Sequence, residues 1–272
     1  MDDDRITRAY RRLARSRRAV DAALWVRNIA TVLAGHRLTD GFDPERNGEL
    51  WFLRQAIPDA RVVLDVGANL GNWAAPALAA GPRIERLVAY EPSHATALEL
   101  TDRFAGDDRV EVVEAAVSDA PGEATLWEEP GHGETTSLAA GPASAAAAPR
   151  TVRVVTLDDE LRRLAVDFVD LLKVDAEGYD LHVLRGAGEL LGRQAIGVIQ
   201  FEYNAPWLYA GSTLHAALAL LRGHGYAPYL LKRSGLHRYD EARYGELFWY
   251  ANFVALSPAA QPRFRPLVGP EL

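Results

Sequence analysis

Four carboxylates of the sequence stand at or near the ends of apolar, strand-like runs. They are Asp65 in the run 62–66, Glu91 after 87–90, Asp175 after 168–174, and Glu202 after 196–201. In an open parallel sheet the carboxyl ends of the strands meet at one edge, where ligands bind. Carboxylates that converge there repel one another, and a cation relieves the repulsion. The pattern therefore predicts a site for a cationic ligand, which is either a sulfonium cofactor or a divalent metal ion.

The sequence of the loop after the first run distinguishes between two kinds of cofactor. A dinucleotide loop needs the pattern G-x-G-x-x-G, so that the backbone can approach a pyrophosphate. Gly67 supplies the first glycine, but Asn69 and Asn72 stand where the second and third belong. A side chain at Asn69 obstructs a pyrophosphate, whereas S-adenosylmethionine carries an adenosine and a charged amino acid tail without phosphate. The loop therefore favours S-adenosylmethionine over a nicotinamide dinucleotide.

Each part of that cofactor has a candidate partner. Asp65 faces the ammonium of the tail or the sulfonium, and Glu91, at the end of the next strand, accepts the ribose hydroxyl protons. Asp119, with Ser118 beside it, accepts a hydrogen bond from the adenine amino group, although a Ser–Asp pair at a strand end is also a common turn cap. The predicted cofactor-binding residues are Asp65, Gly67, Asn69, Gly71, Glu91, Ser118, Asp119 and Asp175.

The segment after the run 168–174 contains acids that can act as bases toward a methyl acceptor. A hydroxyl acceptor must lose its proton as it attacks the methyl group, and a positioned base contributes typically about 10²–10⁴-fold. Acids at a helix start are also favoured by the helix dipole, so Glu177 and Asp180 have a second, structural interpretation. His132 lies in a segment that can swing over a substrate, whereas His182 is interpreted as structural. The predicted catalytic residues are Asp175, Glu177, Glu202 and His132.

A metal ion is the open alternative for the same acids. Asp175, Glu177 and Glu202 can hold Mg²⁺, whose charge lowers the pKa of a bound hydroxyl. The sequence has no cysteine. Disulfides, thiolate nucleophiles and zinc–thiolate sites are therefore excluded.

Alternating strand and helix patterns predict an α/β fold, with a mostly parallel sheet covered by helices on both faces. The predicted strands lie near 61–66, 85–90, 110–116, 122–127, 168–174, 196–201, 226–231 and 247–256, and the predicted helices near 71–80, 93–105, 179–191 and 213–224. The Ala-, Gly- and Pro-rich stretch 130–150 is expected to be a lid or a tolerated surface insertion.

Residues 1–57 are predicted to be a helical extension, followed by one catalytic domain, 58–258, and a tail, 259–272. Seven arginines crowd the first 18 residues, and Ile6, Tyr10 and Leu13 have helical spacing. This basic helix is expected to pack on the domain or on a second subunit, which makes the N-terminal helices a candidate homo-oligomer interface. An anionic partner is the alternative.

Composition narrows the class of protein further. The net charge of −7 argues against general nucleic-acid binding. No stretch approaches the ~20 apolar residues of a membrane span. The N-terminus lacks an apolar signal core, so a cytoplasmic location is expected.

Several motifs together resemble the FkbM-type methyltransferases, a class I S-adenosylmethionine-dependent family. They are residues 64–71, 90–92, 116–119, 156–158, 172–178, 184–187 and 200–204. The resemblance covers roughly residues 47–256. It implies a class I methyltransferase Rossmann-like fold of seven strands, the last one antiparallel. It also implies O-methylation, commonly of sugars, polyketides or other natural products, with Asp65, Gly67 and Glu91 at the cofactor and Asp119 near adenine.

The leading hypothesis is therefore an S-adenosylmethionine-dependent O-methyltransferase that acts on a hydroxyl of a small molecule or a sugar-containing natural product. A nicotinamide-dependent oxidoreductase is the second hypothesis, and the missing glycines and the absence of a plausible Tyr-x-x-x-Lys pair speak against it. A non-catalytic cofactor-binding partner protein is the third, and the four strand-end acids argue against it.

Overall fold

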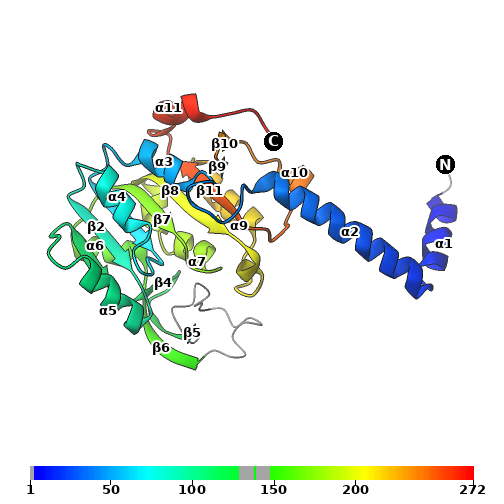
Figure 1. The fold of residues 1–272 in the computed structure, drawn as a ribbon, viewed down its shortest axis with the longest axis horizontal. Helices are drawn as coiled ribbons and strands as arrows, with labels where there is room; N and C mark the ends of the chain where they lie inside the picture. Colours follow the sequence, from blue (N-terminus) through cyan, green and yellow to red (C-terminus); the bar gives the residue numbers. More distant parts are fainter. Residues whose placement is uncertain (1–2, 129–137, 139–147) are drawn as a thin grey trace.

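The computed structural model describes residues 3–128, 138 and 148–272 of the 272-residue chain. A large central sheet runs through the domain, and helices cover both of its faces (Figure 1). Its strands are β1 (Val62–Val66), β2 (Arg86–Tyr90), β3 (Val110–Val113), β7 (Val169–Val174), β8 (Ile196–Tyr203), β9 (Ala227–Lys232), β10 (Gly235–His237) and β11 (Ala251–Leu256).

The strand order is β10-β9-β11-β8-β7-β1-β2-β3. Strands β3, β2, β1, β7 and β8 are parallel to one another, and β11 lies antiparallel between β8 and β9. The predicted α/β class and the antiparallel last strand are therefore confirmed. The sheet has one strand more than the seven expected, because β9 turns back into the short β10 through Arg233 and Ser234.

A second sheet lies beside the first and was only partly predicted. It has the order β4-β6-β5, with β4 (Ala116–Val117), β5 (Gly122–Glu128) and β6 (Ala148–Val155). The expected strand 110–116 was wrong in extent, because β3 ends at Val113 and β4 joins the other sheet. Strand β6 was missed, although Val152 and Val154 alternate with exposed Arg153 in the period of a half-buried strand.

The helices are α1 (Asp3–Leu13), α2 (Arg17–Leu38), α3 (Glu49–Ala56), α4 (Ala74–Ala80), α5 (His94–Arg103), α6 (Leu157–Leu164), α7 (Asp180–Arg185), α8 (Gly188–Gly192), α9 (Leu214–Gly223), α10 (Glu241–Tyr244) and α11 (Gln261–Phe264). The single helix expected over 179–191 is divided into α7 and α8. Gly186 stands between them, against Ser118, where a β-carbon would lie 2.0 Å from the Ser118 carbonyl oxygen. Thr213 caps α9 as predicted, because its side chain accepts a hydrogen bond from the Ala216 amide.

Two apolar cores sandwich the central sheet. Leu64 and Leu172 point into the core that α7 and α9 close, and Val63 and Leu171 point into the core that α3 and α4 close. This alternation is what strands covered on both faces require. The site described below lies at the carboxyl edge of the parallel strands.

The N-terminal region divides into two parts. Helix α3 is part of the domain, because Phe52 and Leu53 are buried in the same core as β1 and α4. Helix α1 and most of α2 run away from the domain as an arm, residues 3–34, with the N-terminus at its far end (Figure 1). The division of the chain at residues 57 and 58 stays a prediction. Among the described helices, none combines the length and the apolar character that crossing a membrane requires.

Candidate active site at the carboxyl edge of the sheet

A cavity of about 850 Å³ opens at the carboxyl ends of β1, β2, β7 and β8. Binding sites for small molecules and cofactors typically enclose about 300–1,000 Å³. Most of the predicted site residues line it: Asp65, Gly67, Asn69, Glu91, Asp175, Glu177 and Glu202. Gly71, Ser118 and Asp119 are described by the structure but are not among the lining residues. His132 lies outside the described residues.

The loop after β1 is held by backbone contacts that a side chain would disrupt. Gly67 has a φ of +76°, and a β-carbon on it would lie 1.9 Å from the carbonyl oxygen of Asp175. The amides of Gly67 and Ala68 both donate to the Tyr90 carbonyl at 3.0 Å. The β1 loop, the end of β2 and the end of β7 are thereby tied together. The glycine is required by this close approach of two backbones.

Glu91 fastens the same loop from the end of β2. Its Oε2 accepts a hydrogen bond from the Asn69 amide at 2.9 Å, and its Oε1 accepts one from the Ser93 amide at 2.9 Å. Asn69 has a φ of +48°, which asparagine tolerates better than most residues. Glu91 also lines the cavity, and each of its carboxylate oxygens has two lone pairs. The ribose contact predicted for Glu91 is compatible with this position and stays a prediction.

Asp65 is the most deeply buried acid of the cavity wall, with 1% of its surface exposed. Its Oδ2 has no hydrogen-bond partner among the described residues. Burial raises the pKa of Asp65 to about 7, while the charge of Lys173 opposes the rise. A buried carboxylate without a partner is costly unless a ligand supplies the missing charge or hydrogen bond. The position therefore suits the ammonium of an amino acid tail.

A buried lysine stands among the acids, and the sequence analysis missed it. Lys173 is 2% exposed, and its Nζ lies 3.2 Å from Asp175 Oδ2 and 3.5 Å from Glu49 Oε1. Burial alone would lower the pKa of Lys173, but Asp175, Glu49 and Glu202 together raise it well above its ordinary value. The ammonium is thus kept charged. A lysine inside the apolar run 168–174 was the signal that could have identified it.

Glu177 and Glu202 face each other across Asn204. The Asn204 Nδ2 donates to Glu202 Oε1 at 2.8 Å and to Glu177 Oε2 at 3.5 Å. Burial, followed by the charge of Asp175, raises the pKa of Glu177 to about 8 and that of Glu202 well above its ordinary range. The pKa of about 8 suits Glu177 to exchange a proton near neutral pH. We call the acids gathered around Lys173 the acid cluster: Glu49, Asp175, Glu177 and Glu202.

The alternative of a magnesium site at Asp175, Glu177 and Glu202 is not supported. Within the described parts of the chain, no group of three or more His, Asp or Glu side chains is arranged to hold a metal ion. The physical reason is that Lys173 already pairs with Asp175, and Asn204 already donates to the two glutamates. The cation that the converging acids were expected to require is, in part, the protein's own ammonium.

Residues 36–50, which we call the wall segment, close one side of the cavity. His36, Phe42 and Glu49 line it together with Trp249 and Tyr250. The ring of Phe42 lies 4.5 Å from that of Tyr250, and His36 meets Trp249 edge-on at 5.8 Å. This segment belongs to the predicted extension 1–57, and its contribution to the site was not predicted.

Two aromatic side chains that follow β8 do not reach the cavity. Trp207 is fully buried in the core, where its Nε1 donates to the Glu202 carbonyl at 2.9 Å. Tyr209 is exposed and does not line the cavity. Trp249 and Tyr250, which precede β11, line it instead.

Asp119 has a structural partner outside the cavity. Its Oδ2 lies 3.0 Å from His182 Nδ1, and its Oδ1 accepts from Ser118 Oγ at 3.2 Å. His182 also lies 3.2 Å from the Ala210 carbonyl, which agrees with its structural interpretation. The adenine contact proposed for Ser118 and Asp119 stays a prediction.

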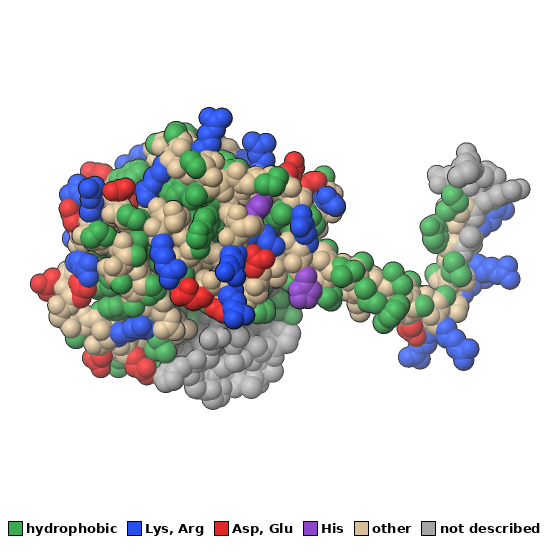
Figure 2. Space-filling view, turned by 45° about the horizontal axis from the view of Figure 1, so that its top comes forward, with side chains coloured by type: hydrophobic (Ala, Val, Ile, Leu, Met, Phe, Trp, Pro, Cys, Tyr) green, Lys and Arg blue, Asp and Glu red, His purple; other side chains and the backbone are tan. Residues whose placement is uncertain are grey.

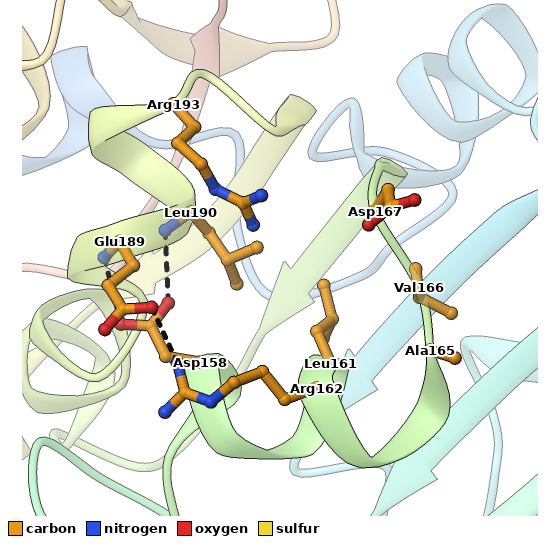
Figure 3. A pocket seen from close by; sticks show the side chains of 9 residues that line it. All are labelled: Asp158, Leu161, Arg162, Ala165, Val166, Asp167, Glu189, Leu190 and Arg193. Atoms are coloured by element: carbon orange, nitrogen blue, oxygen red, sulfur yellow. Dashed lines mark hydrogen bonds and ion pairs between the residues drawn. The ribbon is translucent and has the colours of Figure 1, made fainter.

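A second, smaller pocket of about 210 Å³ lies between α6 and α8 and shares no lining residue with the large cavity (Figure 3). Asp158 accepts hydrogen bonds there from the amides of Glu189 and Leu190 at 2.9 and 3.1 Å. Thr156 caps the start of α6 through the Asp159 amide. The motif 156–158 therefore stabilises helix starts and does not reach the large cavity.

Comparison with known proteins shows similarity to methyltransferases. A family model described as the methyltransferase FkbM domain matches residues 65–228. A curated relative, the 2-O-methyltransferase NoeI of Sinorhizobium fredii (strain NBRC 101917 / NGR234), is 27% identical over 174 residues, which are 59% of this chain and 70% of the relative.

Solved structures with similar folds are remote in sequence. The crystal structure of methyltransferase FkbM from Methylobacillus flagellatus KT is 16% identical with a TM-score of 0.45, and the match covers 86% of this chain and 60% of that one. The Aeropyrum pernix fibrillarin, solved with natively bound S-adenosylmethionine, is 14% identical with a TM-score of 0.42, and the match covers 74% of this chain and 68% of that one. The family model matches more than half of the chain, from β1 into β9, and the chain therefore belongs to the FkbM methyltransferase family.

Proposed function

We propose that this chain transfers the methyl group of S-adenosylmethionine to a hydroxyl of a small molecule or a sugar-containing natural product. The observation that carries the proposal is that residues at the ends of β1 and β2 and acids at the ends of β7 and β8 line one cavity. We assign Asp65, Gly67, Asn69 and Glu91 to a cofactor half of this cavity, and the acid cluster with Asn204 to an acceptor half. Family membership supports methyl transfer, and the 2-O-methyltransferase relative supports oxygen as the acceptor atom.

The first half fits the cofactor. Asp65 offers a buried carboxylate oxygen, without a partner among the described residues, for the ammonium of the tail. Glu91 offers acceptor capacity for the ribose, and the turn at Gly67 leaves backbone rather than side chain facing the ligand. When bound, S-adenosylmethionine supplies an electrophilic methyl group on a sulfonium. Six lining residues are acids, which favours a ligand of net positive charge: Glu49, Asp65, Glu91, Asp175, Glu177 and Glu202.

The second half fits a hydroxyl acceptor. Glu177 and Glu202 are placed to take the proton that the hydroxyl releases, and Asn204 fixes their orientation through its amide. Lys173 holds Asp175 in place and keeps part of the negative charge neutralised. Trp249, Phe42 and Tyr250 offer apolar faces on which a ring of the acceptor can pack. With the cofactor bound, Glu177 and Glu202 would take up the proton that the acceptor hydroxyl loses when its oxygen receives the methyl group.

Methyl transfer from labelled S-adenosylmethionine to a panel of hydroxyl acceptors tests this proposal. Replacing Glu177 or Glu202 by Gln is expected to lower kcat by about 10²–10⁴-fold, as the loss of a positioned base does. Binding of S-adenosylhomocysteine is expected to change little, because the two glutamates lie in the acceptor half. Glu123→Gln, an exposed acid of β5, is the matched control. Full activity of both glutamine variants would remove these residues from the chemistry.

Calorimetry separates the proposal from the oxidoreductase alternative. We expect the chain to bind S-adenosylhomocysteine and not NAD, since the side chain of Asn69 occupies the path of a pyrophosphate. No observation on the described residues favours a nicotinamide cofactor. Tight binding of NAD in competition with S-adenosylhomocysteine would overturn the proposal.

A further inference from the structure

The arm, residues 3–34, is the largest feature that methyl transfer does not use. It projects from the domain, and hydrophobic side chains run along α2 while arginines gather at the far end (Figures 1 and 2). Trp25 and Leu33 are 66% and 67% exposed, which is unusual for side chains of this size. Exposed apolar surface of this extent marks an interaction site on a globular protein.

Six apolar residues of α2 form a continuous stripe, while Val20 and Leu24 lie on the other side of the helix. Its members follow one another at intervals of three and four residues, which places them on one side of a helix. They are Ala22, Trp25, Val26, Ile29, Val32 and Leu33. Between Ala19 and Gly35 the charged residues are Asp21 and Arg27, and neither belongs to the stripe. Two helices pack against each other as a coiled coil when their apolar residues recur at these intervals.

The base of the arm is fixed to the domain, so the stripe cannot fold back onto it. Gly35 packs against the ring of Trp249, where a β-carbon would lie 2.3 Å from the nearest ring atom. Lys232 donates to the Arg37 carbonyl at 2.8 Å and pairs with Asp40 at 3.1 Å. Leu38, at the end of α2, is buried. The helix therefore leaves the domain in a set direction, with its stripe facing water.

The charge distribution indicates which partner covers the stripe of α2 and in which direction the partner's helix runs. Residues 1–18 hold seven of the 30 basic residues and three of the 37 acidic ones, so the arm tip carries +4 and the rest of the chain −11. Two α2 helices side by side in parallel would bring both arginine clusters together. An antiparallel pair instead sets each cluster beside the partner's helix C-terminus and acidic domain, where both the helix dipole and the net charge are favourable.

We propose that α2 pairs antiparallel with α2 of a second copy of this chain, in a twofold dimer centred on Ile29. A twofold interface requires a self-complementary patch, and the stripe residues Trp25 and Val26 lie four and three positions before Ile29, as Val32 and Leu33 lie three and four positions after it. Helix α2 has 22 residues and so spans about 33 Å. Its arginine-rich start then lies beside the partner's wall segment, at the rim of the partner's cavity.

Light scattering and sedimentation equilibrium of the full chain test the dimer. We expect a dimer for the unmodified chain and a monomer for the double variant Ile29→Glu and Leu33→Glu. Arg27→Glu, which puts a carboxylate on the opposite side of the same helix, is the matched control and is expected to remain a dimer. Circular dichroism and S-adenosylhomocysteine binding check that each variant is folded. A monomeric unmodified chain, or a dimeric double variant, contradicts the proposal.

Cysteine cross-linking tests the direction, because the chain has no cysteine of its own. Ile29→Cys is expected to form an intermolecular disulfide on mild oxidation, whereas Ala22→Cys, far from the centre, is not. Equal cross-linking of both variants would show a parallel pair and refute the antiparallel arrangement. Vesicles of anionic phospholipid serve as the competing partner: a chain that is monomeric in solution and sediments with them would show that the stripe binds a membrane surface instead. None of these measurements depends on methyl transfer.

Discussion

At the scale of single residues, the site is defined by carboxylates whose environments differ. Asp65 is buried with an oxygen that has no partner among the described residues, Glu91 accepts two amides, and Glu177 and Glu202 share one asparagine. Glu91 holds a loop, and in the proposed function Asp65 would meet a cation while Glu177 and Glu202 would take up a proton. Environment rather than residue type assigns these roles.

Asp65→Asn is expected to weaken binding of S-adenosylhomocysteine by about 10- to 100-fold, since hydrogen bonds to charged groups contribute about 1.5–3 kcal/mol. Calorimetry measures the effect, and Asp102→Asn on the exposed side of α5 is the control. The variant is also expected to unfold at a higher temperature at pH 8 without ligand. The folded-state pKa of Asp65 is raised from 3.8 to about 7, so its ionised form costs stability as pH rises through that interval. An unchanged affinity would show that Asp65 does not contact the ligand.

Cofactor binding is expected to strengthen as pH rises from about 6 to 8. In the free protein the pKa of Asp65 is about 7, because this carboxyl group is buried. A cationic ligand favours the ionised carboxylate, so binding releases protons and is weaker at low pH, where Asp65 is protonated. Titrations in buffers of different ionisation enthalpy count the protons released. An affinity that is constant between these pH values would contradict the assignment of Asp65 to the cation.

Lys173→Met is expected to destabilise the fold by about 3–5 kcal/mol, because it leaves the buried charge of Glu49 and the half-buried charge of Asp175 uncompensated. Adding Glu49→Gln to this variant removes one of the two charges and is expected to recover part of the loss. Urea denaturation of the single and double variants measures both effects. If the double variant is no more stable than Lys173→Met, the three residues do not act as one network.

At the scale of the elements, the strand ends bring the site together. Residues of β1, β7 and β8 that are adjacent in register, Asp65, Lys173 and Gln200, lie side by side across the sheet. The loop after β1 can reach the end of β7 because Gly67 has no side chain. Sequence positions far apart are thus placed within one cavity by parallel pairing alone.

Gly67→Ala tests that close approach. The variant is expected to lose measurable S-adenosylhomocysteine binding, because its methyl group would meet the Asp175 carbonyl at 1.9 Å. Gly106→Ala is the control: Gly106 also has a positive φ, of +91°, but no atom of the described residues lies within 4 Å of an added β-carbon. The control is expected to show only backbone strain of about 1–2 kcal/mol, with binding intact. Equal loss in both variants would assign the effect to strain rather than to contact.

The alternation of strand and helix was predictable from the sequence, and so were the four strand-end acids. Apolar runs bounded by turn residues identify strands, and parallel pairing then places Asp65, Glu91, Asp175 and Glu202 at one edge. Lys173 was not predicted, since a lysine within an apolar run gives no indication of which charges it will meet. Strand β6 was missed because its alternation follows an alanine-rich stretch without strand character.

At the scale of the whole molecule, part of the N-terminal region forms one side of the large cavity. The wall segment packs on residues that follow α10 and precede β11, more than 200 positions away in the sequence. That contact depends on tertiary packing of Phe42 and Asn47 against Tyr250, which no local pattern encodes. The arm continues from the same segment, so a dimer built through α2 would hold the cavity wall from outside.

A crystal structure of the chain with S-adenosylhomocysteine bound is the most direct test of the central claim, which is that the two halves of the cavity hold cofactor and acceptor. We expect the Asp65 carboxylate within hydrogen-bonding distance of the ligand's amino group, and Glu91 at the ribose hydroxyls. The sulfur should face Glu177, Glu202 and Asn204. A ligand bound elsewhere, or with its sulfur turned away from the acid cluster, would contradict the account.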